Sequence, residues 1–105
     1  MSKTVDMEKV IREQMRWLIL EALNAGRPIG CADVTVLSSV QGVIENATML
    51  DVRREMAYLR DRDLIKIEGR GLSPIWHTEL THHGVDVVEY AVPCYPGIAR
   101  PKKWW

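Results

Sequence analysis

The 105-residue chain contains little cysteine and no long apolar segment, and both features narrow the class of protein. Two cysteines, Cys31 and Cys94, are too few for a disulfide framework. No apolar run approaches the roughly 18 residues that a membrane-spanning helix needs, and the start MSKTVDMEKV lacks the apolar core of a signal peptide. We therefore expect one cytoplasmic protein with reduced thiols and no membrane partner.

An excess of charge of either sign is also missing. Fourteen basic and fourteen acidic residues cancel, and the sequence pI is about 6.8. Many nucleic-acid-binding domains are visibly basic, because neutralisation of phosphates supplies most of their non-specific affinity. A nucleic-acid role for this chain would therefore have to rest on a local cluster of residues.

Motifs of enzymes and metal sites are absent as well. The sequence contains no G-x-x-x-x-G-K-[ST], G-x-G-x-x-G or G-x-S-x-G pattern. Its metal-ligating residues, His77, His82, His83, Cys31 and Cys94, match no structural zinc spacing, because there is no Cys-x2-Cys and two of the histidines are adjacent. We expect no catalysis, no cofactor and no metal.

Helical periodicity dominates the first half of the chain. Apolar residues recur at helical spacing over residues 10–23, Asp6 is suited to cap the helix start, and Gly26 is a stop signal. A second, shorter helix is predicted at residues 34–45, with a short strand as the alternative for its first half, because β-branched residues and Gly42 lower its helix propensity. The first apolar stripe consists of Val10, Ile11, Met15, Leu18, Ile19, Ala22 and Leu23.

Residues 48–80 predict a third helix followed by a β-hairpin. Thr48 and Asp51 have the spacing of a capping box, and an apolar stripe follows them. Residues 64–68 and 74–80 read as two strands around the turn Gly69-Arg70-Gly71. The helical stripe consists of Leu50, Val52, Met56, Ala57 and Leu59.

A short helix and a tail complete the chain. Thr81 is suited to cap a helix with Val85, Val88 and Ala91 on one side. The segment PCYPGIARPKKWW then holds three prolines, three basic residues and two tryptophans, which predicts an extended tail partly ordered by its aromatic residues. We expect a folded domain over residues 5–91 and the tail over residues 92–105.

The order of these elements indicates the α+β class and resembles the winged helix-turn-helix arrangement. The phrase VRREMAYLRDRDLIKIEG resembles the junction between recognition helix and wing in that superfamily. The phrase LTHHG resembles the Leu-Thr-x-x-Gly that often closes the wing and opens the last helix. The resemblance covers about residues 10–90 and implies three helices, a β-hairpin wing and a C-terminal helix.

The end of the chain is similar, more narrowly, to a small winged-helix protein family of Mu-like phages and prophages. Its matching residues are Leu80, Thr81, Gly84, Asp86, Val87, Pro96, Gly97, Ile98, Arg100 and Pro101. This resemblance implies a phage origin, and hence the host cytoplasm, without implying an activity. Family members often carry glycine where this chain has Asp63, which must then adopt whatever backbone conformation that position requires.

The winged-helix resemblance implies a set of DNA contacts. Thr48, Asp51, Arg54 and Tyr58 would face base edges, and Arg53 and Arg70 would face phosphates, with Arg70 also suited to the minor groove. The alternative is a solvated or protein-facing helix crossed by ion pairs, because residues 48–63 carry four arginines and four acidic residues. Asp51 and Glu55 would repel phosphates.

The four tryptophans divide into two pairs. Trp17 and Trp76 are expected in or beside the core, whereas Lys102, Lys103, Trp104 and Trp105 form a candidate surface for a partner. The sequence therefore supports two functions. The first is DNA binding by a phage-encoded regulator or DNA-handling accessory protein, for which the long first helix offers a homodimer surface. The second is a protein-interaction module, without DNA binding, that docks through its tail.

Overall fold

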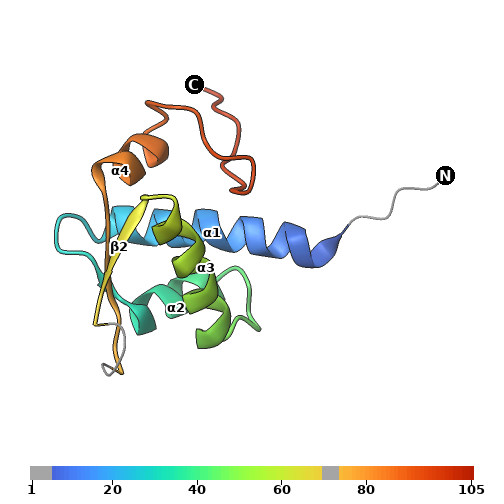
Figure 1. Ribbon diagram of the computed structural model, residues 1–105. Coiled ribbons are helices and arrows are strands. Elements are labelled where there is room, and N and C mark those ends of the chain that lie inside the picture. Colours follow the sequence, from blue (N-terminus) through green and yellow to red (C-terminus); the bar gives the residue numbers. More distant parts are fainter. Residues whose placement is uncertain (1–5, 70–73) are drawn as a thin grey trace.

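The longest element, α1, spans Met7–Ala25, and its first turns extend beyond the other helices (Figure 1). The computed structural model describes residues 6–69 and 74–105. The Asp6 side chain accepts a hydrogen bond from the Lys9 amide at 3.1 Å, and the helix ends at Gly26. Both predicted boundaries of this helix are therefore confirmed.

The second helix is confirmed but shorter than predicted. Strand β1 (Cys31–Ala32) precedes α2 (Asp33–Gln41), so the helix ends four residues early and the short strand lies before it rather than in its first half. Gly42 is the C-cap residue of α2, and residues 42–46 form turns. Glycine has low helix propensity, which explains the early end.

Helix α3 (Met49–Asp61) begins and ends through local backbone chemistry. The capping box is confirmed, because Thr48 Oγ1 accepts from the Asp51 amide and Asp51 Oδ2 accepts from the Thr48 amide. At its other end, the Leu64 and Asp63 amides donate to the Leu59 and Arg60 carbonyls, which is the Schellman pattern. Asp63 occupies the left-handed position of that motif, with φ of 58°.

A three-stranded antiparallel sheet follows. Strands β2 (Ile65–Glu68) and β3 (His77–Leu80) pair as the predicted hairpin, and β1 pairs with the other side of β3 to give the order β1-β3-β2. The returning strand begins at His77 rather than at residue 74. The predicted turn residues Arg70 and Gly71 lie outside the described residues.

Helix α4 (His82–Val88) is packed unusually closely against the start of β2. Thr81 caps it as predicted, accepting from the Gly84 amide at 3.0 Å. A Cβ atom on Gly84 would lie 2.1 Å from the Leu64 carbonyl oxygen, so only glycine permits this approach. The buried residues of α4 are Gly84 and Val87, whereas Val85 and Val88 are only partly buried. The helix ends before Ala91, which was predicted to share a side of it with Val85 and Val88.

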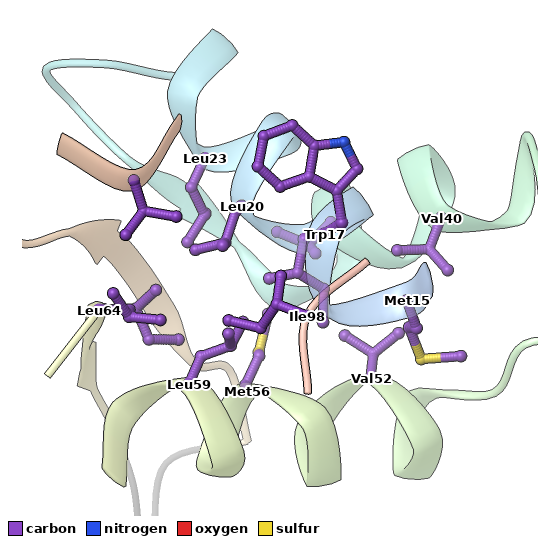
Figure 2. Packing of buried hydrophobic residues seen from close by; sticks show 14 of the residues in the cluster. Met15, Trp17, Leu20, Leu23, Val40, Val52, Met56, Leu59, Leu64 and Ile98 are labelled. Atoms are coloured by element: carbon purple, nitrogen blue, oxygen red, sulfur yellow. The ribbon is translucent and has the colours of Figure 1, made fainter. Parts of the chain in front are cut away.

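The core lies where α1, α2 and α3 meet the sheet and α4 (Figure 2). Within the described residues, four helices and three strands form one α+β domain. Two predicted apolar stripes need correction: Leu50 is 75% exposed, and Val10 and Ile11 are exposed on the projecting turns of α1. Glu55 takes a buried position on α3 instead.

The tail folds back onto the domain (Figure 1). Ile98 is 5% exposed and enters the core between α1 and α3 (Figure 2). The Ala99 amide donates to the Glu13 carbonyl, and Arg100 Nη1 donates to the carbonyls of Val87 and Val92. The tail residues up to Arg100 are therefore part of the packed structure.

The remaining sequence predictions concern tryptophan and membranes. Trp17 is buried, and Trp76 is partly buried against the core, as predicted. Within residues 6–69 and 74–105, none of the helices has the length and hydropathy needed to cross a bilayer.

Among the described residues, Asp63 and Tyr90 are non-glycine residues at left-handed positions, and they make a matched test of backbone strain. Asp63→Gly is expected to raise the free energy of unfolding by about 0.5 kcal/mol, because it relieves the left-handed conformation at a residue that is exposed. Tyr90→Gly relieves the same conformation but removes ring contacts with Trp17 and Trp105 and a hydrogen bond to Pro101, so we expect a loss of about 2 kcal/mol. Urea denaturation measures both changes in the free energy of unfolding. Two changes of the same sign would contradict this account.

Candidate nucleic-acid interface

The structure brings three of the predicted DNA-contacting residues together at the start of α3. Thr48 and Asp51 form the capping box, and Arg54 follows one turn later with its side chain 57% exposed. Arg54 Nη2 lies 3.2 Å from Asp51 Oδ1, and Arg54 Nε lies 3.0 Å from Glu55 Oε2. This corner carries one exposed guanidinium held by two carboxylates.

Hydrogen bonds shift the pKa values of Asp51 and Arg54 so that both groups are charged. The Thr48 amide, followed by the Thr48 side chain, lowers the pKa of Asp51, and Arg54 lowers it further. The hydrogen bond to Glu55 raises the pKa of Arg54. Asp51 is therefore an anion at neutral pH, and any phosphate that approaches Arg54 also approaches this carboxylate.

Arg53 lies away from the other three and clamps α3 to α2 and the hairpin. Its Nε and Nη2 donate to Asp33 Oδ2 at 2.9 and 2.6 Å, and Nη2 also donates to the Pro74 carbonyl. Its guanidinium lies over the Trp76 ring, 4.7 Å from the centroid. Asp33 Oδ2 also accepts from the Trp76 amide, while the buried Oδ1 has no hydrogen-bond partner. Arg53 thus neutralises a buried carboxylate.

Tyr58 does not join Thr48, Asp51 and Arg54 in an open surface, because both faces of its ring are covered. The guanidinium carbons of Arg16 and Arg62 each lie 3.5 Å from its ring centroid, and two groups so close must lie on opposite faces. Its ring is therefore closed to stacking with a base. Arg70, the remaining predicted residue, lies outside the described residues.

Sequence reasoning missed Arg12, which α1 brings beside the start of α3. Arg12, Asp51 and Arg54 line one groove of about 310 Å³ between these helices. Across the described residues, Arg12 has no carboxylate within ion-pair distance. No local pattern marks this residue, because its neighbours come from the tertiary packing of α1 against α3.

The exposed side of α2 is uncharged, and the sequence signal for this is a run without charged residues. Residues 34–44 carry no charged side chain, and Thr35, Ser38 and Ser39 are exposed. Hydroxyl groups are common partners of phosphate oxygens in protein–DNA interfaces. Helix α2 therefore offers exposed hydroxyls, in addition to the two arginines of the groove beside α3.

The four predicted partner-binding residues lie elsewhere, at the end of the tail. Trp104 is 87% exposed and Trp105 is 64% exposed, and their rings meet edge to face with centroids 5.7 Å apart. Lys102 and Lys103 are exposed, and Lys103 Nζ lies 5.5 Å from the Trp105 ring centroid. This cluster borders the second half of α1 rather than α3.

Among the described residues, no group of three or more histidine, cysteine, aspartate or glutamate side chains is arranged to hold a metal ion. Burial raises the pKa of both Cys31 and Cys94. Both thiols are therefore protonated at neutral pH, a state with little nucleophilic character.

The Asp33–Arg53 clamp is tested by a double-mutant cycle. Arg53→Met is expected to cost about 3 kcal/mol, because it leaves the buried Asp33 carboxylate without its cation. Combining it with Asp33→Asn should cost clearly less than the sum of the two single changes. Urea denaturation gives the four free energies, and additivity within about 0.5 kcal/mol would contradict the clamp. Arg60→Met, which breaks an exposed pair with Asp61, is the control and should cost under about 1 kcal/mol.

Comparison with known proteins does not assign the chain to a family. No protein-family model matches the chain, and no curated protein matches it.

Proposed function

We propose that this chain is a winged helix-turn-helix protein that binds double-stranded DNA, as a small phage- or prophage-encoded regulator or DNA-handling accessory protein. Helices α2 and α3 supply the helix-turn-helix in this proposal, and the β2–β3 hairpin supplies the wing. The order of the four helices and the β2–β3 hairpin supports the assignment, since it agrees with the winged-helix arrangement expected from the sequence. Strand β1, which adds a third strand beside β3, was not part of that expectation.

One observation carries the DNA proposal: the start of α3 is exposed, and Arg12 and Arg54 line one groove beside it. A recognition helix reads the major groove with residues near its N-terminus, which is where Arg54 lies. Leu50, one turn earlier and 75% exposed, is suited to contact a thymine methyl group. Exposed hydroxyls on α2 are suited to the flanking phosphates.

The ion pairs of α3 limit the affinity to expect. Arg53, Arg54 and Arg60 each have a carboxylate within 3.2 Å, so little uncompensated charge remains along this helix. Non-specific affinity grows with the number of phosphates neutralised. We therefore propose modest non-specific binding, with selectivity contributed by base contacts.

A homodimer fits the same proposal. Met7, Val10 and Ile11 are exposed on the projecting turns of α1, at 59%, 45% and 39%. Their burial against a second copy would remove apolar surface from water and place two copies of α3 on two half-sites.

The DNA proposal predicts opposite effects for two neighbouring substitutions. Arg54→Ala should weaken binding to a random-sequence duplex at about 50 mM salt by roughly tenfold, because a groove contact is lost. Asp51→Asn should strengthen binding a few-fold, because it removes a charge that repels phosphate while the amide oxygen still accepts from the Thr48 amide. Fluorescence anisotropy measures both affinities.

Arg60→Ala is the matched control for this titration, because Arg60 lies at the far end of the same helix. Its affinity should stay within about twofold of the parent value. Absence of binding at about 50 mM salt, or equal effects of Arg54→Ala and Arg60→Ala, would contradict the proposal. A site-selection experiment is justified if binding falls steeply at about 200 mM salt.

The second candidate function is docking of a protein partner through the tail, favoured by the exposure of Trp104 and Trp105. Removal of residues 102–105 separates the two functions. At about 150 mM salt, where charges are screened beyond roughly 8 Å, the truncated chain should bind duplex DNA within about twofold of the full chain. A tenfold loss of duplex affinity in the same anisotropy assay would instead make the tail part of the DNA interface.

A further inference from the structure

A hollow of about 360 Å³ lies between the second half of α1 and the end of the tail. Four aromatic side chains, Trp17, Tyr90, Trp104 and Trp105, contribute to its lining. This volume lies within the range of small-molecule sites. The hollow is separate from the groove beside α3, whose α1 residues lie between positions 8 and 15.

The aromatic lining is held in place by Tyr90. This residue occupies the left-handed position after α4, with φ of 61°, where glycine is the usual residue. Its ring lies edge to face with Trp17 and with Trp105, at centroid distances of 6.2 and 4.9 Å, and its hydroxyl donates to the Pro101 carbonyl at 2.7 Å. A costly backbone conformation is thus tied to a fixed aromatic arrangement, which would spare a ligand the cost of ordering it.

Trp104 is the open member of this set. This residue is 87% exposed, whereas Trp105 is 64% exposed and its ring contacts Tyr90, Lys103 and Trp104. An exposed indole face is a platform for a planar ring, and each nucleobase stacked on an aromatic side chain contributes about 1–3 kcal/mol. The open face favours a flat aromatic ligand over an irregular apolar one.

Two polar groups on α1 face the same hollow one helical turn apart. Glu21 is exposed and, within the described residues, has no hydrogen-bond or ion-pair partner. Asn24 Oδ1 accepts from Arg27 Nη1 at 3.1 Å, which leaves the Asn24 amide NH2 group to donate. Residues at this spacing on a helix lie about 5–6 Å apart at Cβ. The hollow therefore offers a carboxylate acceptor beside an amide donor.

Guanine matches this pair better than the other bases do. Its N1–H and N2–H groups are two parallel donors that suit one carboxylate, and its O6 is an adjacent acceptor for an amide N–H. Lys102 also lines the hollow, is exposed, and has no carboxylate partner among the described residues, so it is suited to a phosphate.

We propose that this hollow binds a guanine nucleotide, either free or as an unpaired nucleotide of a single strand. The base stacks on Trp104, its Watson–Crick edge meets Glu21 and Asn24, and Lys102 contacts the phosphate. This site does not rest on duplex binding by α3. Failure of the duplex titration leaves it standing, and Arg54→Ala should not affect it.

The test is a titration of the full chain, followed by the indole N–H signals of its tryptophans in ¹H–¹⁵N NMR spectra, with GMP, AMP and CMP as the probes. We expect the Trp104 and Trp105 signals to shift with GMP at an affinity about tenfold tighter than with AMP or CMP. Glu21→Gln should lower the GMP affinity by about tenfold and leave AMP within about twofold, because only the guanine edge requires the carboxylate.

Two further variants separate stacking from base recognition. Glu45→Gln makes the same chemical change at an exposed residue outside the hollow and should leave GMP binding unchanged. Trp104→Ala should weaken all three nucleotides about equally, by tenfold or more, and its exposure makes loss of the fold unexpected.

A single-stranded tetranucleotide with one guanine separates the two sources of ligand. Affinity well above that of GMP identifies a single strand, and equal affinity identifies the free nucleotide; both support the proposal. Absence of Trp104 and Trp105 shifts with every nucleotide would overturn it. A GMP affinity that Glu21→Gln leaves unchanged would also overturn the proposal. So would Trp104 and Trp105 shifts that appear with a proline-rich peptide and with none of the nucleotides, because the hollow would then belong to a protein partner.

Discussion

The buried carboxylate of Glu55 is the interaction on which the arrangement of α1, α3 and the tail depends. Glu55 is 1% exposed, and its two oxygens accept from Arg16 Nε at 2.8 Å and from Arg54 Nε at 3.0 Å. Arg16 also donates to the Gly97 carbonyl and covers the ring of Tyr58. A charge removed from water needs such partners, since burial of an isolated carboxylate costs far more than one ion pair returns.

This network links the core to the candidate DNA surface. Glu55 orients Arg54 from the buried side while Asp51 holds it from the exposed side, so the side chain has a fixed direction at the start of α3. A fixed guanidinium loses less conformational entropy on binding than a free one, but its carboxylate partners compete with phosphate. The same geometry therefore favours selectivity over raw affinity, in agreement with the zero net charge of the chain.

Local signals explain what the sequence could predict. Asp6, Thr48 and Thr81 each cap a helix through a hydrogen bond within three residues, and the hairpin follows from alternation around a glycine-rich turn. Asp63 was recognised as a position that glycine usually fills, and its φ of 58° gives the reason. Local interactions of this kind can be predicted from the sequence because both partners lie within a few residues of each other.

Contacts between distant residues explain what the sequence could not predict. Hydropathy alone would bury Leu50 and expose Glu55, whereas Leu50 is exposed. Glu55 can be buried because Arg16, 39 residues before it, neutralises the acid. The same applies to Arg53, whose partner Asp33 lies 20 residues away, and to Tyr58, which Arg16 covers. The sequence therefore predicts the candidate DNA-binding residues as one surface, whereas their tertiary partners place the described ones in three separate locations.

Helix α1 is what keeps the two proposed sites apart. Arg12 belongs to the groove beside α3, and Glu21 belongs to the aromatic hollow beneath the tail. Nine residues separate them, which corresponds to about 13 Å along a helix axis. Each site has its own fixed elements, the capping box of α3 at one and the left-handed Tyr90 at the other. A duplex at the first site and an unpaired nucleotide at the second would both lie beside helix α1. Simultaneous occupancy would therefore suit a junction between double-stranded and single-stranded nucleic acid. Besides the helix, the hydrogen bonds from Arg54 through Glu55 and Arg16 to the Gly97 carbonyl join α3 to the tail.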